Sequence, residues 1–296
     1  MYSLMLLLLI QKFEVLTGIA RTPTVCWHGV NDHANSSCSA LLKVVNDVMP
    51  GVFTMSIKIG DSLQMDTMNS VLMSASDQVN YACNIIANNP NLSDGYNALG
   101  ISQGGLMLRG VAQRCPKPPM KNLITFGSPH QGIFGIPKCQ SYLGYSVCQM
   151  LTTILSSVFS LQWIQKMFTP AQYWHDPFNQ PSYVAGSQFL ADINNEREEK
   201  NQSYKQALLA LKNLVLVKWT KDTSVIPRES SQFGFYNLGG DNTTITLQEM
   251  PLYQRDWLGL QAMKIQGRLH FKEVEGDHML FKRKWFIFNI IIPFLL

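Results

Sequence analysis

The chain has 296 residues, of which 46% are hydrophobic and 15% are charged, a composition that suits one well-packed globular domain. No linker, low-complexity tract or internal repeat divides it, which argues against two domains or a repeat protein. The net charge of +4 comes from dispersed basic residues, and the densest run, at 282–284, lacks interleaved aromatic residues, so we expect no nucleic-acid partner.

Residues 1–20 are predicted to be a secretory signal peptide. The apolar run at 4–10 is far too short to span a bilayer, and Gly18 and Ala20 resemble the small residues before a signal-peptidase cleavage site. No Lys or Arg precedes the run, so a plain N-terminal helix is the alternative.

Strands and helices alternate along residues 21–296. The predicted strands lie at residues 23–27, 51–57, 95–99, 123–126, 214–219 and 268–274. The predicted helices between and after them lie at residues 40–48, 77–88, 104–113 and 285–296. The last of these contains Pro293 and is too short for a transmembrane anchor, so it predicts a core helix. The alternation indicates an α/β fold, with a mainly parallel sheet covered by helices on both faces.

Residues 133–206 interrupt this alternation. An apolar helical stretch at 151–168 is followed by Tyr173-Trp174-His175-Asp176-Pro177 and by a charged segment at 194–200. We expect a helical cap inserted into the single domain. An ordinary pair of packing helices is the alternative, because periodicity alone does not separate the two.

A G-x-S-x-G motif, Gly100-Ile101-Ser102-Gln103-Gly104, joins a predicted strand to a predicted helix. The bare pattern arises by chance in about one chain in ten of this length, so its position carries the argument. A sharp strand-to-helix turn needs glycines beside the serine and raises the hydroxyl to the carboxyl edge of the sheet. We therefore expect an α/β-hydrolase with Ser102 as nucleophile, and a purely structural glycine turn is the alternative.

A serine nucleophile needs a base and an acid that orients the base, and in this fold the chain order is Ser, acid, His. His278 directly follows the last predicted strand, so we expect it to be the base. Asp222 follows the preceding strand by three residues and is the predicted acid, holding the imidazole in the right tautomer. Three other candidates fit less well: Asp241 in a glycine loop, Asp256 in a predicted helix and Asp277 beside the base.

The oxyanion of a tetrahedral intermediate needs backbone N–H donors. One predicted donor is Gln103, directly after the nucleophile. The second is Val30, because His28-Gly29-Val30 after the first strand resembles the His-Gly element of esterases.

Four sequons and six cysteines favour the secretory pathway. The sequons make Asn35, Asn91, Asn201 and Asn242 candidates for glycosylation. The cysteines lack the spacing of metal ligands, so we expect disulfides in an oxidising compartment and no metal.

Several short motifs together resemble those of a known family. The motifs are Gly100-Ile101-Ser102-Gln103-Gly104-Gly105, Arg114-Cys115-Pro116, Pro118-Pro119-Met120, His130-Gln131-Gly132, Tyr173-Trp174-His175-Asp176-Pro177, Phe233-Gly234-Phe235-Tyr236, Leu258-Gly259-Leu260 and Glu275-Gly276-Asp277-His278. They resemble those of the palmitoyl-protein thioesterases, a family with lysosomal members. The likeness runs from residue 25 to 294, and Tyr-Trp-His-Asp-Pro is far more specific than G-x-S-x-G.

The resemblance implies a lysosomal or secreted enzyme that hydrolyses palmitoyl thioesters on cysteines of S-acylated proteins or peptides, without a metal or cofactor. It places the catalytic triad on Ser102, Asp222 and His278, the residues chosen above. A lipase or acyl-CoA hydrolase with the same triad is the alternative. A non-catalytic lipid-binding homologue is less consistent with an intact triad.

The resemblance also implies disulfides Cys83–Cys115 and Cys139–Cys148. The family has two adjacent cysteines after the His-Gly loop, whereas here only Cys38 stands there, so its pairing with Cys26 stays open.

A long acyl chain needs an apolar groove, which we expect the predicted cap to supply. The candidate groove residues are Ile154, Val158, Phe159, Leu161, Trp163, Ile164, Met167 and Phe168.

Overall fold

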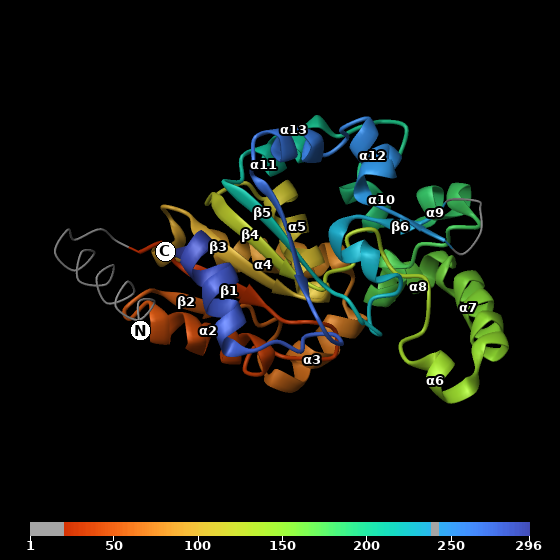
Figure 1. Cartoon of the computed structure of the whole chain (residues 1–296), viewed down its shortest axis with the longest axis horizontal. Helices are drawn as coiled ribbons and strands as arrows, with labels where there is room; N and C mark the ends of the chain where they lie inside the picture. Colours follow the sequence, from red (N-terminus) through yellow and green to blue (C-terminus); the bar gives the residue numbers. More distant parts are fainter. Residues whose placement is uncertain (1–20, 238–242) are drawn as a thin grey trace.

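A parallel sheet forms the centre of the molecule, for which a computed structural model describes residues 21–237 and 243–296 (Figure 1). Its strand order is β2-β1-β3-β4-β5-β8, and every neighbouring pair is parallel. A short antiparallel pair, β6 and β7, lies outside this sheet. The strands are β1 (Thr24–Trp27), β2 (Thr54–Ser56), β3 (Tyr96–Ile101), β4 (Met120–Phe126), β5 (Asn213–Trp219), β6 (Phe235–Tyr236), β7 (Thr244–Ile245) and β8 (Leu269–Val274).

The inner strands are apolar along almost their whole length because helices cover both faces of the sheet. All residues of β1 and β3 are buried, and successive side chains point to opposite faces. Val25 and Trp27 pack on one face, and Cys26 packs on the other. The predicted α/β fold is therefore confirmed.

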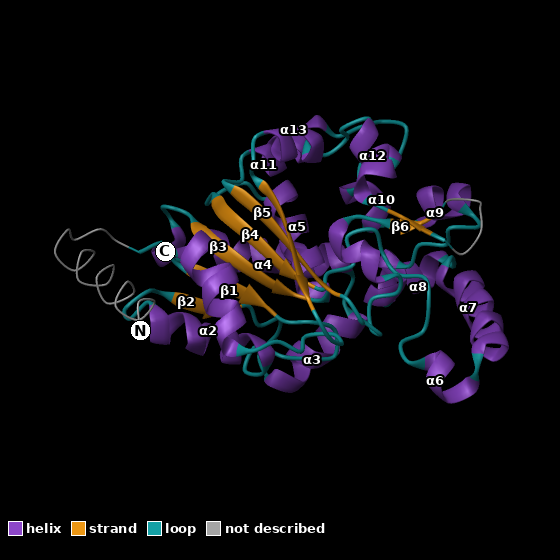
Figure 2. Cartoon of the chain, in the orientation of Figure 1, coloured by secondary structure: helices purple, strands orange, loops and turns teal. Residues whose placement is uncertain are grey.

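Helices form a layer on each face of the sheet (Figure 2). The first layer consists of α4 (Ala75–Ala87), α5 (Gln103–Arg114), α11 (Gln202–Leu209) and α13 (Leu260–Ile265). The second consists of α2 (Ser37–Val48), α14 (Arg283–Phe286) and the π-helix η5 (Ile287–Leu295). The C-terminal segment is thus a core helix, as predicted. Over the described residues, none of the helices has the length and apolar character needed to cross a bilayer.

The segment after β4 forms a group of helices beyond the carboxyl ends of the strands, far from the C-terminus (Figure 1). Helix α11 begins inside the predicted insertion but packs against α5 and α13 in the first layer. The helices from β4 to β5, apart from α11, are α6 (Cys139–Leu143), α7 (Tyr145–Phe159), α8 (Gln162–Met167), η2 (Thr169–Tyr173), α9 (Gln180–Gly186) and α10 (Leu190–Ile193).

The remaining helical segments lie in loops. Apart from the helix predicted around Asp256, which adjoins the last of them, the sequence did not predict them. They are α3 (Leu63–Leu72), η1 (Pro90–Leu92), η3 (Arg228–Gln232), η4 (Leu247–Glu249) and α12 (Pro251–Gln254).

A buried arginine holds the chain where it returns from this helical group. The guanidinium of Arg109, on α5, donates to the carbonyl of Ile193 (3.2 Å), the side chain of Asn194 (2.7 Å) and the carbonyl of His130 (3.3 Å). Arg109 is fully buried and also stacks over Phe233. A buried charge without such partners would be strongly destabilising, so these contacts fix the returning chain to α5.

A ladder of polar side chains crosses the amino-terminal ends of four strands. The amide of Asn122 on β4 donates to Asn97 on β3 (2.7 Å), and Asn213 on β5 donates to Asn122 (2.8 Å). His270 on β8 then bonds to Asn213 (2.9 Å). Buried amides are costly to leave unpaired, so this ladder favours a single register of the strands.

Three disulfides are present in the described part of the chain. Cys83–Cys115 and Cys139–Cys148 are the pairs that the family resemblance implied. Cys26–Cys38, whose pairing the sequence left open, joins β1 to the start of α2.

Glu196, close to Arg109, should make folding stability depend on pH. Burial raises its pKa to about 7, even though hydrogen bonds from Tyr183 and Asn194 and the charges of Arg109 and Lys200 favour the ionised form. The folded state then holds the proton more tightly than the unfolded state, whose pKa is about 4.5. The contribution of protonated Glu196 to folding stability is therefore fully present below pH 4.5 and is lost as the pH rises towards 7.

The variant Glu196→Gln should lose this pH dependence, because a neutral amide keeps the bond from Tyr183. The free energy of unfolding of the variant minus that of wild type should be larger at pH 8 than at pH 5, by on the order of 1–3 kcal/mol. Urea unfolding of both proteins at the two pH values measures this. Parallel pH profiles would contradict it.

Candidate active site

Ser102 alone forms the turn between β3 and α5. Its backbone has φ +51° and ψ −124°, an unusual conformation for a non-glycine residue, and its N–H donates to the carbonyl of Phe126 (2.7 Å). A Cβ atom at Gly100 would collide with Gly105, and one at Gly104 with the carbonyls at the end of β1. The turn therefore requires the glycines of the predicted motif.

His278 and Asp222 meet at the carboxyl edge of the same sheet. Nδ1 of His278 lies 2.7 Å from Oδ2 of Asp222, whose side chain is fully buried. The other carboxylate oxygen accepts the N–H groups of Ser224 (2.8 Å) and Val225 (2.9 Å). With a proton on Nδ1, Nε2 of His278 is the free basic nitrogen. The His278 side chain is 15% exposed and lines the same cavity as Ser102.

Two of the other candidate acids, Asp277 and Asp256, lie among the described residues, and neither makes a hydrogen bond to the His278 ring. Asp277 accepts the N–H of His278 (2.8 Å) and of Thr223 (2.9 Å), joining the loops after β8 and β5. Burial raises the pKa of Asp277, but these hydrogen bonds outweigh it and hold the pKa below its usual value. Asp256 lies in a turn after α12, not in the predicted helix, and pairs with Lys205 (2.9 Å). Asp241 is outside the described residues.

The predicted oxyanion residues both lie near Ser102: Gln103 follows it in the chain, and Val30 follows Gly29, which approaches it closely. A Cβ atom at Gly29 would come within 3.1 Å of the Ser102 Cβ, so the loop after β1 passes directly against the serine. Val30 and Gln103 both line the cavity. The Gln103 side chain is held by the carbonyl of Ser70 (2.8 Å) and the hydroxyl of Tyr173 (2.9 Å).

A second His–Asp pair, which the sequence did not predict, supports this loop. Nε2 of His28 lies 3.1 Å from Asp66 on α3, and both side chains are buried. Asp66 also accepts the N–H groups of Ile59 (2.7 Å) and Ala34 (2.8 Å). Burial raises the pKa of Asp66, but the bonds from His28 and these amides lower it overall. No sequence signal marked Asp66, because α3 has only a weak amphipathic pattern.

An apolar cavity of about 510 Å³, called the inner cavity below, contains Ser102 and His278 in its wall. Of the predicted groove residues, Phe159 and Phe168 line it, together with Leu155, which was not predicted. The prediction was wrong for the other six, which do not line it: Ile154, Leu161, Trp163 and Met167 are exposed, and Val158 and Ile164 are half-buried. Helix α8 is only about two turns long, which is too short for the spacing of its apolar residues to show which face is directed inward.

Three candidate glycosylation sites, Asn35, Asn91 and Asn201, are exposed. Asn201 also caps α11 by accepting the N–H of Ser203 (3.0 Å). Asn242 lies outside the described residues.

The chain is similar to known thioesterases. The model of a family described as palmitoyl protein thioesterase matches residues 23–278. The chain is 41% identical to palmitoyl-protein thioesterase 1 of Caenorhabditis elegans, over 97% of this chain and 96% of that protein. The protein belongs to the palmitoyl-protein thioesterase family. It is also 32% identical to palmitoyl-protein thioesterase 3 of Dictyostelium discoideum (92% and 90% covered) and 27% identical to lysosomal thioesterase PPT2 of Rattus norvegicus (83% and 78% covered).

The position of Ser102 predicts a single reactive serine. A fluorophosphonate should label wild type at Ser102, and Ser102→Ala should abolish labelling and lower hydrolysis by about 10³-fold or more without changing the melting temperature greatly. Peptide mapping by mass spectrometry locates the label. Labelling at another serine, or an active Ser102→Ala protein, would refute the assignment.

The His278–Asp222 bond predicts a large effect of Asp222→Asn. An amide at this position favours the wrong imidazole tautomer, so kcat should fall on the order of 10³–10⁴-fold. Asp256→Asn is the control and should keep a near-normal kcat, because Asp256 pairs with Lys205 instead. If the control lost activity and Asp222→Asn did not, the acid would be misassigned.

Proposed function

We propose that this protein hydrolyses long-chain fatty acyl thioesters on the cysteines of S-acylated proteins or peptides. The observation that carries the proposal is that Ser102 and His278 lie in the wall of an apolar cavity, with Asp222 bonded to His278. Membership of the palmitoyl-protein thioesterase family supports the substrate class.

In the proposed reaction, Oγ of Ser102 attacks the thioester carbonyl carbon while Nε2 of His278 takes its proton. The oxyanion is stabilised by the N–H groups of Gln103 and Val30. The C–S bond then breaks, and the thiolate takes the proton from His278. Water, deprotonated by His278, then attacks the acyl carbon. The bond to Oγ breaks, Oγ of Ser102 takes the proton back from His278, and the fatty acid leaves. Asp222 keeps the imidazole oriented throughout.

The inner cavity supplies the binding energy for a long acyl chain. Each buried methylene contributes about 0.8 kcal/mol, so a sixteen-carbon chain gains far more from an apolar wall than a short one. The cavity volume of about 510 Å³ lies within the range of small-molecule sites. The aromatic ring of Phe159 packs against those of Phe168 and Trp174 in its wall.

We further propose that the protein works in the lysosome, or is secreted. A relative named lysosomal thioesterase supports this location. The three disulfides suit an oxidising secretory route. The raised pKa of Glu196, to about 7, favours the folded state in an acidic compartment.

The inner cavity predicts that kcat/KM rises with acyl length from butanoyl to palmitoyl thioesters. Phe159→Asn should lower kcat/KM for the palmitoyl substrate roughly ten-fold and leave the butanoyl substrate nearly unaffected, because only the long chain reaches this wall. Trp163→Asn, an aromatic-to-amide change at an exposed position outside the cavity, is the matched control.

The measurement is steady-state hydrolysis of a thioester series, with matched palmitoyl oxygen esters and melting temperatures for each variant. A flat chain-length profile in wild type would refute the proposed acyl site. Faster turnover of oxygen esters than of thioesters would favour a lipase instead.

A further inference from the structure

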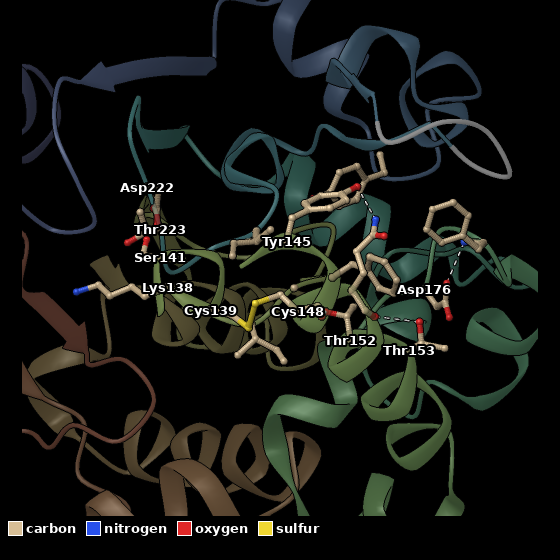
Figure 3. A pocket seen from close by; sticks show the side chains of 17 residues that line it. Lys138, Cys139, Ser141, Tyr145, Cys148, Thr152, Thr153, Asp176, Asp222 and Thr223 are labelled. Atoms are coloured by element: carbon tan, nitrogen blue, oxygen red, sulfur yellow. Dashed lines mark hydrogen bonds between the residues drawn. A yellow bond between two sulfur atoms is a disulfide. The ribbon is translucent and has the colours of Figure 1, made fainter. Parts of the chain in front are cut away.

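A second cavity, called the outer cavity below, lies between the α6–α7 hairpin and the loop after β5 (Figure 3). Its volume is about 760 Å³, larger than that of the inner cavity. Asp222, Thr223 and Lys138 lie at one end of it, and Asp176 lies at the other (Figure 3). The proposed reaction uses none of its walls except the loop that carries Asp222.

Two chain segments separate the outer cavity from the inner one. In the loop after β5, Asp222 and Thr223 line the outer cavity, whereas Ser224 and Val225 line the inner one. In the segment after β4, Gly135 borders both cavities, and a Cβ atom there would come within 2.7 Å of Ile226 across the boundary. The two cavities therefore adjoin beside the His278–Asp222 pair.

The walls of the outer cavity differ chemically from those of the inner one. Helix α7 contributes Gln149, Thr152 and Thr153. The two threonine hydroxyls donate to helix carbonyls (2.8 and 3.1 Å), which leaves their oxygens able to accept further N–H groups. Phe134 and Tyr236 add aromatic surface. A mixture of hydrogen-bonding and apolar groups suits a polypeptide, whereas a fatty chain gains only from the apolar part.

The position of the leaving group in the proposed reaction indicates what binds in the outer cavity. A thioester has two halves, and when the acyl chain fills the inner cavity the thiol-bearing half must lie beside His278, which protonates the departing sulfur. The outer cavity begins at Asp222, the residue bonded to His278. We propose that the outer cavity binds the peptide chain that flanks the acylated cysteine. This inference rests on the function proposed above.

The test compares two substrates that share one palmitoyl thioester: a short S-palmitoylated peptide with its cysteine in the middle, and S-palmitoyl-N-acetylcysteamine, which has no peptide. Gln149→Trp and Ser141→Trp place a large ring in the outer cavity from two exposed positions. Each should lower kcat/KM for the peptide substrate roughly ten-fold, mainly through KM, and change kcat/KM for the other less than about two-fold. Gln162→Trp, at an exposed helix position that lines neither cavity, is the matched control.

The outcomes separate this inference from the proposed function. If wild type hydrolyses neither substrate, the proposed function itself fails. Suppose instead that wild type hydrolyses both substrates. If the two outer-cavity variants then keep full kcat/KM for both substrates, or lose it equally for both, the peptide site is refuted and the proposed function stands. A loss of kcat/KM confined to the peptide-free substrate would assign the outer cavity to the acyl chain and would also refute the peptide site. Melting temperatures close to wild type show that each variant is folded.

Discussion

A single residue, Ser102, separates the last residue of β3 from the first residue of α5, and the site depends on this short connection. The helix can begin so soon only because Gly100 and Gly104 let its first turn approach β3 and the end of β1 without a side chain between them. The close approach also draws the loop at Gly29 against the serine. The positions of Ser102, the first turn of the helix and the loop at Gly29 are thus set by one packing constraint.

Two His–Asp pairs lie near this turn, and their surroundings give them different roles. His28 and Asp66 are both buried, and Asp66 also accepts two backbone N–H groups, so the pair fixes the loop after β1. In the other pair Asp222 is equally buried, but His278 is partly exposed and borders the inner cavity. The same chemical pair therefore acts as a structural support where it is enclosed and is available for proton transfer where it borders a cavity.

The sequence was most informative where one local rule decides the structure. The inner strands are buried on both faces, so apolar runs marked them, and the motif around Ser102 marked the turn. Asp66 was missed because its bond to His28 joins residues 38 apart, and α3 is only weakly amphipathic. The wall of the inner cavity was only partly predicted, since it depends on how short helices pack. An exposed Trp163 looks the same in sequence as a half-buried Phe159 that lines the cavity.

The asparagine ladder through Asn97, Asn122 and Asn213 has a consequence for how this fold diversifies. It specifies strand register at the end of the sheet opposite to both cavities, using side chains that touch neither of them. Insertions and substitutions in the loops at the other end therefore leave the pairing of the strands intact. An ancestral scaffold of this kind is free to acquire new substrate preferences by changing helices α6 to α10, and a protein engineer can exchange these helices without redesigning the sheet.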